Sequence, residues 1–527
     1  MQRQTDGRGA GARRAEVLAA LSIAIDLGLG LPMEHMLRSS LLAAILAEEL
    51  DLTEEQRTTI YYTNLVLWIG CHADSHEFSR WFGDDLAMRR DSYQLDWSGP
   101  AYMKYLLRRT GSNDPLPRRT QKRLSLLLAP QARMAALIHS HCLSAGLMTE
   151  RIGLERAVGE AVECAFERWD GNGLPAARSR DEIPLATRVV QLAETCEVHL
   201  RMYGVSGALA MTRERSGRQF DPSLVEALSR CRDRIDALPD QDVWATALDL
   251  APDGDVVLHG GELDSLLGAI GDFADLKCPF TAGHSRTVAE TAAAAAVHVG
   301  LTGEDVDLVR QAALVHDLGR MGVPNSVWEK QGPLTESDRE RIRLYPYLTG
   351  RILNRVRGLE TVAAVAGNHR ERLDGSGYPR GIGGSALPMT QRILAAADSY
   401  RESLEHRPHR PALATEQAAA RLRSEVRAGR LDATAVDAVL AVSGHQQGRR
   451  SPGPAGLTAR EVEVLGLFAR GFTSTEIARR LVISAKTVRN HLEHIYLKAG
   501  VSNRTGAALF ALQHGIAGSA EDGAAAP

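Results

Sequence analysis

Residues 457–515 constrain the fold more than any other part of the chain, because four stretches of helical periodicity follow one another there, each behind a capping residue. The residues expected to cap the four helix starts are Thr458 with Glu461, Thr473 with Glu476, Ser484, and Ser502. A Ser or Thr followed three residues later by Glu satisfies two free N–H groups at a helix start. Apolar residues then recur at helical spacing, which is typical of amphipathic helices. This region is therefore predicted to form a small four-helix module.

The third helix of this module has a polar outer face. With Val488 and Leu492 turned inward, the side chains that face outward are those of Lys486, Arg489, Asn490 and Glu493. A short helix and a turn at 482–484 precede it. A short helix, a turn and a polar-faced second helix together indicate a helix-turn-helix.

The charge of this region differs from that of the whole chain. Residues 457–515 contain eight Arg and Lys against four Glu, a net charge of +4, whereas the whole chain carries −3. A local excess of positive charge favours binding to nucleic acid. The alternative is an amphipathic bundle whose charges are only solvated. Glu493 lies where a cation would help binding to DNA, so high intrinsic affinity is not expected.

The stretches IAxxL, S-x-KTVxxH and IYxKxGVxNR closely resemble the C-terminal domain of LuxR-type transcription regulators, over about sixty residues. The resemblance implies that residues 485–497 enter the major groove of double-stranded DNA. Arg489 and Asn490 are the best candidates for reading bases, since Arg suits guanine and Asn suits adenine. The residues expected to hold phosphates are Lys486, Thr487, His491 and Lys498. Such modules bind two half-sites one helical turn apart, so a homodimer is expected.

The rest of the chain has the composition of a helical globular protein. Its 527 residues suggest three or more domains, and only 5% of them are aromatic while Ala and Leu dominate. No run of eighteen apolar residues occurs, and the six cysteines lack CxxC pairing. We therefore expect a cytoplasmic protein that has no contact with a membrane, no disulfide framework and no cysteine zinc site.

Composition also predicts the domain boundaries. The expected segments are a disordered tail at 1–14, a helical domain at 15–237 (the first copy), a linker at 238–255, a second helical domain at 256–444 (the second copy), a Gly/Pro/Arg linker at 445–456, the four-helix module at 457–516, and a disordered tail at 517–527.

The second copy contains a candidate metal site. His284 opens a helix, His316 and Asp317 are adjacent in an apolar helix, and Asp398 lies in a third helical run. Two His and two Asp suit one divalent ion such as Mn²⁺, Fe²⁺ or Zn²⁺. A lone helical His is more often a packed residue than a ligand. A carboxylate inside an apolar helix needs a cation or several donors, which favours the metal interpretation.

Residues 276–440 resemble the HD-GYP branch of HD-domain phosphohydrolases, through GHSRTVA, HDLGRMGVP, RERLDGSGYPRG and ILAAADSY. The resemblance implies a helical bundle that holds one to three metals and hydrolyses phosphodiesters, including cyclic di-GMP. The expected fold is therefore all-α, with two HD-type bundles followed by the LuxR-type module. The segment DGSGYPRGIGG at 374–384 is expected to form a short hairpin.

The second metal position of that family is incomplete in this chain. Its His-Pro landmark reads Tyr345-Pro346, and its His-His pair reads His369-Arg370. The Lys that follows the His-Asp pair in the family is Arg320. Only His369 and the bridging Asp317 therefore remain for a second ion. We expect Arg370 to stand in for it, because a guanidinium repels a second cation, and Asp317, Arg320 and Arg370 become the catalytic candidates.

The first copy is predicted to be an eroded duplicate of the second. FERWDGNGLP at 166–175 parallels RERLDGSGYP, and His35 and Glu194 match His284 and Asp398. The metal-binding pair has become Leu67-Trp68, the double His has become Ala165-Phe166, and Leu174 stands where the second copy has Tyr378. A structural or dimerisation domain is the favoured interpretation, and a small-molecule pocket is the alternative.

Residues 72–97 have no counterpart in the second copy. His72, Asp74 and His76 form a cluster there, which we expect to lie in a solvated surface loop.

Two functions fit these features. The preferred one is a transcription regulator whose HD-type domains sense or process a ligand, possibly a nucleotide or cyclic dinucleotide, at a one-metal site. The alternative is a metal-dependent phosphodiesterase with an attached DNA-binding module.

Overall fold

A computed structural model of the chain describes residues 11–97, 99–112, 114–128, 130–238, 242–445, 454–501, 503–514 and 516. The chain divides into two compact units, residues 1–443 and 444–527, and each is described by itself. The predicted cap Ser502 and the predicted tail 517–527 lie outside the described residues, as do most of the predicted tail 1–14 and most of the predicted linker 445–456.

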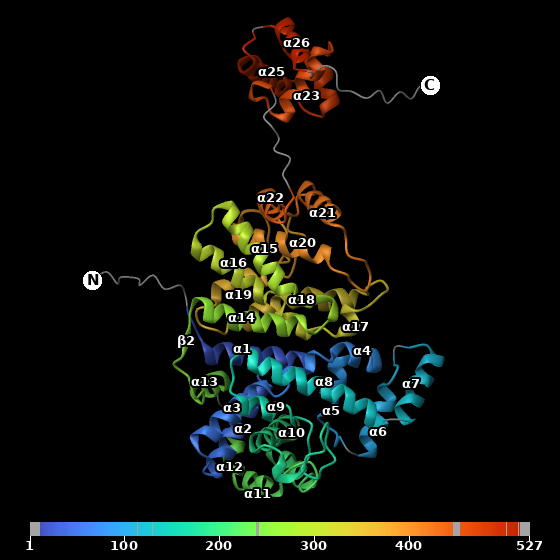
Figure 1. Ribbon diagram of the computed structural model, residues 1–527, viewed down its shortest axis with the longest axis vertical. Coiled ribbons are helices and arrows are strands. Elements are labelled where there is room, and N and C mark those ends of the chain that lie inside the picture. The colour runs from blue at the N-terminus through green and yellow to red at the C-terminus, as the bar shows by residue number, and fades with distance from the viewer. Residues whose placement is uncertain are drawn as a thin grey trace, which may run out of the picture. The chain divides into compact units, whose positions relative to one another are not determined.

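The N-terminal half of the larger unit is a bundle of helices (Figure 1). Its elements are β1 (Ala12–Arg13), α1 (Arg14–Gly28), α2 (His35–Glu49), α3 (Glu54–Val66), the 3-10 helix η1 (Ile69–His72), α4 (Ser75–Phe82), α5 (Asp85–Ser92), α6 (Pro100–Arg109), α7 (Leu116–Leu128), α8 (Pro130–Arg151), α9 (Arg156–Val162), η2 (Arg180–Glu182), α10 (Leu185–Glu214), α11 (Pro222–Arg230) and α12 (Arg232–Asp236).

The second half of this unit is another helical bundle. After α13 (Val243–Asp249), which packs against α2 of the first bundle, its elements are β2 (Val257–Leu258), α14 (Gly260–Asp275), η4 (Pro279–Thr281), α15 (His284–Val299), α16 (Gly303–Val315), η5 (Leu318–Gly322), α17 (Asn325–Trp328), α18 (Glu336–Leu353), α19 (Glu360–Gly367), η6 (Gly384–Ala386), α20 (Met389–Leu404), α21 (Thr415–Arg427) and α22 (Ala433–Val442).

The two halves repeat the same order of elements. In each, a helix that begins with His (α2, α15) is followed by a second helix (α3, α16) and a 3-10 turn (η1, η5). Thr53 and Thr302 cap the second of these helices through their side chains. The order of these elements agrees with the internal duplication predicted from the sequence.

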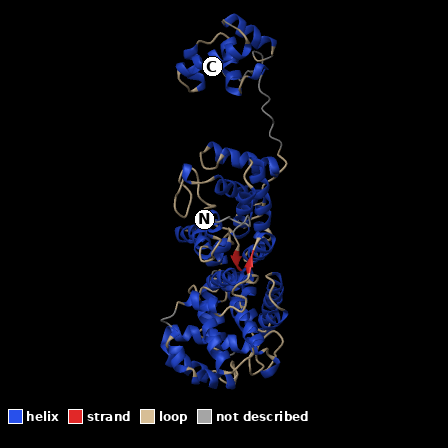
Figure 2. Ribbon diagram, turned by 90° about the vertical axis from the view of Figure 1, so that its left-hand side faces the viewer, coloured by secondary structure: helices blue, strands red, loops and turns tan. Residues whose placement is uncertain are grey.

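The two copies meet through reciprocal contacts. The short strands β1 and β2 pair antiparallel, Ala12 with Leu258 and Arg13 with Val257, and Figure 2 shows them in red. Helix α1, which follows β1, packs against η5 and α18 of the second copy. Helix α14, which follows β2, packs against η1 and α8 of the first. One buried hydrophobic core runs through both copies.

The region predicted as a linker at 238–255 instead contains a packed helix. In α13, Val243, Ala247 and Leu248 are buried in the common core. The Tyr61 hydroxyl donates a 3.0 Å hydrogen bond to the carbonyl oxygen of Ala247. Residues 239–241 of this region lie outside the described part of the chain. The described remainder is therefore fixed to the first copy.

The hairpin expected at 374–384 is wrong. The described backbone there forms turns and then η6, with no strand. Its N–H groups bond in other ways: Tyr378 donates to the carbonyl of Arg370, and Arg380 donates to the Glu371 carboxylate. Because these groups already have partners, they cannot form the ladder of a hairpin.

The smaller unit is a compact helical module. Its elements are η7 (Pro454–Gly456), α23 (Ala459–Ala469), α24 (Ser474–Leu481), α25 (Ala485–Ala499) and α26 (Arg504–Gln513). Thr458 and Thr473 form the predicted capping boxes, and Ser484 caps α25. The all-α fold predicted from the sequence is thus confirmed. Among the described helices, none has the length and apolar character that crossing a bilayer requires.

Candidate functional site

The candidate metal ligands converge from four elements of the second copy. His284 is the first residue of α15, His316 and Asp317 join α16 to η5, and Asp398 lies in α20. All four side chains are at most 1% exposed. His369, which follows α19, lies beside them.

Two features of the backbone position these residues. A buried carboxylate holds the start of α15, and η5 packs closely against α18. Asp275, at the end of α14, accepts hydrogen bonds from the N–H and the hydroxyl of Ser285, both at 2.8 Å, which fixes the start of α15. A Cβ on Gly319 would lie 2.0 Å from the carbonyl oxygen of Tyr345. Only glycine therefore allows η5 to approach α18 this closely.

The four side chains direct nitrogen and oxygen atoms into one small space. His284 Nε2 lies 3.4 Å from Asp398 Oδ1, and His316 Nε2 lies 3.6 Å from Asp317 Oδ1. Among the described residues, no hydrogen-bond partner reaches the atoms His284 Nε2, His316 Nε2 and Asp317 Oδ1, and Asp398 Oδ2 has only an ion pair with Arg370 Nη2 at 3.3 Å. Buried polar atoms without partners are costly. A divalent ion bound by all four groups would satisfy them, so the residues present fit a single metal.

Neighbouring acceptors orient the two imidazoles. His316 Nδ1 lies 2.7 Å from the carbonyl oxygen of Ala313, so this nitrogen carries the proton and leaves the Nε2 lone pair free. His284 Nδ1 lies 2.7 Å from the Glu405 carboxylate. Such contacts behind a ligand fix its tautomer and its direction, as is usual for metal-binding His.

Electrostatics keep the carboxylates ionised in spite of burial. Burial alone would raise the pKa of Asp317, but Arg320 and the surrounding imidazoles hold this pKa well below its usual range. The pKa of Asp398 is also lowered, because Arg370 and the nearby His284 imidazole outweigh its burial. Burial lowers the pKa of His316. These directions favour two anionic carboxylates and a neutral His316, whereas the neighbouring carboxylates of Asp398 and Glu405 raise the pKa of His284 to about 10 against the effect of burial. A metal that binds His284 must therefore displace its proton.

A chain of hydrogen bonds occupies the place where a second ion would require ligands. Arg370 Nε donates to the Tyr345 hydroxyl at 2.7 Å, and this oxygen lies 2.8 Å from His369 Nε2. His369 Nδ1 lies 2.6 Å from the carbonyl of Ala366, so Nδ1 carries the proton and Nε2 accepts from Tyr345. The lone pair that would bind a metal is therefore already in use.

The Arg370 guanidinium also pairs with the surrounding acids. Its Nη1 donates to Glu402 at 2.9 Å, and its Nη2 lies 3.3 Å from Asp398 Oδ2. Glu402 and Glu405 were not among the residues predicted from the sequence. Glu402 lies four residues after Asp398 on α20 and so shares its helix face, which was an available signal. Glu405 follows the end of this helix, and its spacing gave no such signal.

A cavity of about 480 Å³ adjoins this centre. Its lining includes Arg320, Trp328, Lys330, Tyr345, Arg370, Tyr378, Glu402, Arg407 and His409. Arg320 donates to Asp317 Oδ2 at 2.8 Å, and its guanidinium lies 4.3 Å from the centre of the Trp328 ring. The excess of cations over Glu402 makes the cavity suitable for an anion.

The first copy contains no matching ligand set within its described residues, where both candidate metal clusters found belong to the second copy. His35 Nδ1 is held by Glu197 at 2.5 Å. Glu194 accepts hydrogen bonds from the Trp68 indole and from the Tyr93 hydroxyl.

The prediction of a solvated loop at 72–97 is wrong. This segment forms α4 and α5, and His72 and Asp74 are 0% and 3% exposed. His76 contacts Glu329 of the second copy at 2.8 Å. Alternation of charged and apolar residues looks the same in a solvated loop and in helices that fill the contact between two domains.

The C-terminal module exposes most of its predicted DNA-contacting residues. On α25, Lys486, Arg489 and Asn490 are exposed, while Thr487 and His491 are partly buried. The ammonium group of Lys498 lies 2.7 Å from the Glu461 carboxylate, which also closes the capping box of α23. In this structure Lys498 therefore holds two helices together.

Comparison with known proteins agrees with both regions. Residues 269–435 match the HD domain family, and residues 455–511 match the family of bacterial regulatory proteins named luxR. The chain is 28% identical over 411 residues to the 3'3'-cGAMP-specific phosphodiesterase 3 of Vibrio cholerae serotype O1. This match covers 77% of this chain and 89% of that protein. The chain is 36% identical over 179 residues to the 3'3'-cGAMP-specific phosphodiesterase 1 of the same organism, covering 34% of this chain and 42% of the relative.

A solved structure supports the fold. The crystal structure of a cyclic GMP-AMP specific phosphodiesterase from Vibrio cholerae superimposes with a TM-score of 0.57 at 24% identity. The match covers 82% of this chain and 98% of that chain. A likeness at this identity concerns the fold alone.

Proposed function

Because this chain contains an HD domain followed by a LuxR-family DNA-binding domain, we propose that it is a transcription regulator whose second copy binds one divalent ion and, beside it, a phosphodiester ligand. The observation that carries the proposal is the contrast between two neighbouring positions. At the first, the ligand atoms His284 Nε2, His316 Nε2 and Asp317 Oδ1 lack hydrogen-bond partners, whereas at the second Tyr345 and Arg370 occupy the space.

The chemistry of the donor atoms supports a single ion. Two imidazole nitrogens and two carboxylates suit Mn²⁺, Fe²⁺ or Zn²⁺. The guanidinium of Arg370 lies against Asp398 and repels any second cation at short range. Asp317 keeps one oxygen for Arg320 and leaves the other free for the metal.

The cavity beside the centre supports an anionic ligand. Arg320 and Arg370 line it and present guanidinium groups, which bind phosphate oxygens through paired donors. Trp328 and Tyr378 offer rings on which a base can stack. The relatives named above act on cyclic dinucleotides, so this class of ligand is the one we propose to test first.

The C-terminal module would read DNA through α25. Arg489 and Asn490 are proposed to contact bases, and Lys486, Thr487 and His491 to contact phosphates. Lys498 is proposed to contact phosphate only where its pairing with Glu461 is given up. A dimer would supply the affinity that one small module lacks. Ligand or metal state in the second copy would then shift the population of the DNA-binding form.

Hydrolysis of the ligand is the second candidate function. The convergence of two imidazoles and two carboxylates and the position of Arg320 beside Asp317 favour it. A bound divalent ion would polarise a phosphoryl oxygen of the substrate. Arg320 and Arg370 would orient the phosphodiester, and Arg370 would offset negative charge where a second ion is missing. Turnover of 3'3'-cGAMP or cyclic di-GMP that disappears in Asp317→Ala would select this function over binding alone.

Metal stoichiometry on anaerobically purified full-length protein tests the central claim. We expect one tightly bound ion in the wild type, none in Asp317→Ala, and two in the double variant Tyr345→His with Arg370→His. Operator affinity measured with and without metal and dinucleotide then tests regulation. Two ions in the wild type, or operator affinity that never responds, would overturn the proposal.

A further inference from the structure

The first copy contains a cavity where the second copy has its metal centre. Its volume is about 880 Å³, within the range of about 300–1,000 Å³ common for small-molecule sites. Its lining includes Trp68, Tyr93, Trp97, Phe166 and Leu174. The larger cavity therefore belongs to the copy without a ligand set.

The residues that distinguish the two cavities are the former metal-site positions. Trp68 stands in the first copy where the second has Asp317, and Phe166 stands where it has Arg370. Leu174 takes the place of Tyr378. Each exchange removes a polar or charged group and adds an apolar surface. All three replacements line the same cavity. If the metal site had been lost at random, this common location would not be expected.

The rings of this cavity form a cluster with two edge-to-face pairs and one tilted pair. Trp68 and Phe166 lie 5.0 Å apart between centroids at 70°, and Trp68 and Trp97 lie 5.9 Å apart at 64°. Trp97 and Phe166 lie 5.7 Å apart at 40°. These distances and angles are those of favourable aromatic pairs. The ring cluster therefore presents a preformed surface that a further aromatic ring can join.

The charged groups on the cavity wall already have partners. Arg168 pairs with Asp96 at 2.9 Å and with Asp170 at 3.3 Å. Arg89 donates to Ser75 and to the carbonyl of Cys71. An anionic ligand would have to break these contacts, whereas a neutral ligand leaves them intact.

We propose that the first copy is a binding site for a neutral, planar aromatic small molecule, held within the cluster of Trp68, Trp97 and Phe166. Asn172 on the same wall supplies an amide that can hydrogen-bond to a polar edge of the ligand. The site is separate from the metal centre, so the proposal does not depend on the function of the second copy.

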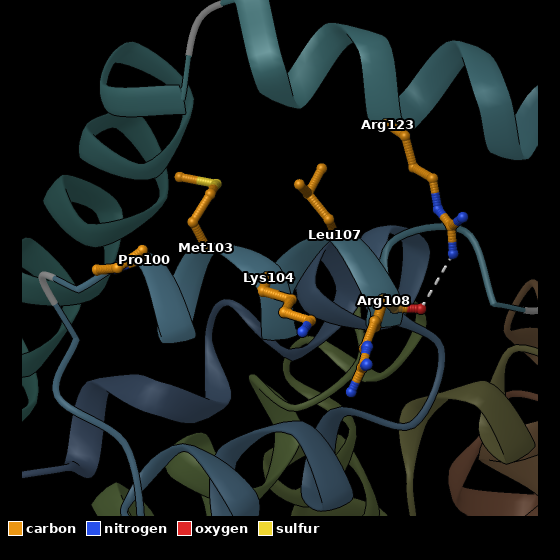
Figure 3. A pocket seen from close by; sticks show the side chains of 6 residues that line it. All are labelled: Pro100, Met103, Lys104, Leu107, Arg108 and Arg123. Atoms are coloured by element: carbon orange, nitrogen blue, oxygen red, sulfur yellow. Dashed lines mark hydrogen bonds between the residues drawn. The ribbon is translucent and has the colours of Figure 1, made fainter.

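A neighbouring cleft supplies a contrast. Met103 lines both the aromatic cavity and a cleft of about 490 Å³ between α6 and α7. Figure 3 shows Met103 and Leu107 on one side of α6 and Lys104 and Arg108 turned to the other, with Arg123 donating to the Arg108 carbonyl. The cations of this cleft would attract an anionic probe, so charge preference separates the two locations.

Fluorescent probes that differ only in charge test the proposal on the full-length protein. N-phenyl-1-naphthylamine is neutral, and 8-anilino-1-naphthalenesulfonate adds one sulfonate to the same ring systems. We expect one saturable site for the neutral probe and at least about tenfold weaker binding of the sulfonate, because its desolvation is not compensated. A preference for the sulfonate, or displacement of the neutral probe by GMP, would overturn the ligand class.

A variant that fills the cavity locates the probe. Ala135 lines the cavity on α8, and Ala135→Trp should abolish binding of the neutral probe. Ala294→Trp, at an exposed position on α15, makes the same substitution elsewhere and should leave binding unchanged. Undiminished binding in a folded Ala135→Trp protein would refute the site. Should that variant not fold, Trp97→Phe provides the readout, because loss of this indole should reduce energy transfer to the bound probe.

Discussion

Asp85 of the first copy accepts a 2.8 Å hydrogen bond from the backbone N–H of Asn325 in the second copy. Asn325 opens α17, three residues after the end of η5, the 3-10 turn that follows Asp317. Asp85 is 0% exposed, and its other oxygen lies 3.6 Å from the ammonium group of Lys277. The segment at 72–97 therefore forms part of the contact between the two copies.

Removal of this carboxylate should destabilise the protein strongly. Asp85→Ala leaves the Lys277 ammonium buried at 1% exposure without its anion. Breaking a buried pair in this way costs about 3–5 kcal/mol. Urea unfolding of the full chain measures the change in the free energy of unfolding.

A surface pair supplies the control for Asp85. Asp181→Ala removes a partner of Arg188, and the Asp181 side chain is 87% exposed. Its loss should change stability by at most about 1 kcal/mol. The double variant Asp85→Leu with Lys277→Met should recover part of the loss, since the Lys277 charge is gone while the buried Arg89, 3.8 Å from Asp85, remains. Equal effects of Asp85→Ala and Asp181→Ala would contradict the role of this contact.

Tyr345→Phe separates the two groups that occupy the second metal position. The change frees His369 Nε2 from its hydroxyl partner but leaves the Arg370 guanidinium in place. If the positive charge is what excludes a second ion, the metal content stays at one per chain. Elemental analysis measures the number of metal ions per chain in Tyr345→Phe and, for comparison, in the double variant that carries both Tyr345→His and Arg370→His. Two ions in Tyr345→Phe would assign the exclusion to the hydroxyl instead.

Local signals in the sequence predicted local structure well. The caps Thr458, Thr473 and Ser484 are confirmed, because a capping side chain bonds to backbone only two or three residues away. The His and Asp residues predicted as one ligand set do converge on one buried space. The sequence motif around each ligand determines its place on its own helix, and the packing of the bundle then brings the helices together.

Long-range contacts account for what the sequence did not predict. The burial of His72 and the packing of α13 depend on partners more than a hundred residues away, such as Phe273 for His72 and Tyr61 for Ala247. The position of the Tyr345 hydroxyl between Arg370 and His369 could not be predicted from the sequence either, since only the fold shows where a side chain points.

Arg489→Ala should weaken specific DNA binding by about 1–3 kcal/mol and relax base preference at one position. Arg489 is exposed on α25, and its only described side-chain hydrogen bond is a 3.4 Å contact with the carbonyl of Ala485. Titration on DNA sites selected by the wild-type protein measures both effects.

Lys486→Ala is the matched control for Arg489. It removes one exposed cation from the same helix and is expected to weaken binding evenly across sequences. The slope of the logarithm of the binding constant against the logarithm of the salt concentration should become smaller in magnitude by about one unit. An unchanged base preference in Arg489→Ala would argue against a base contact.

Glu194 should make the first copy less stable as pH rises. Burial raises the pKa of Glu194 to about 8, and the hydrogen bonds from Trp68 and Tyr93 offset this only in part. Between its unfolded pKa of about 4.3 and this raised value, the folded chain holds a proton that the unfolded chain has lost. Stability therefore falls across this window, by up to about 1.4 kcal/mol per pH unit.

Glu194→Gln removes this titration while keeping an oxygen that can accept from the Trp68 indole. The difference in unfolding free energy between wild type and variant should grow from pH 5 to pH 8 in favour of the variant. His141, whose pKa is raised to about 9 by Cys71 and Asp74 against the effect of burial, is present in both proteins and cancels in the difference. A difference that does not change with pH would mean that Glu194 is ionised in the folded protein, so that the aromatic cavity borders a charge.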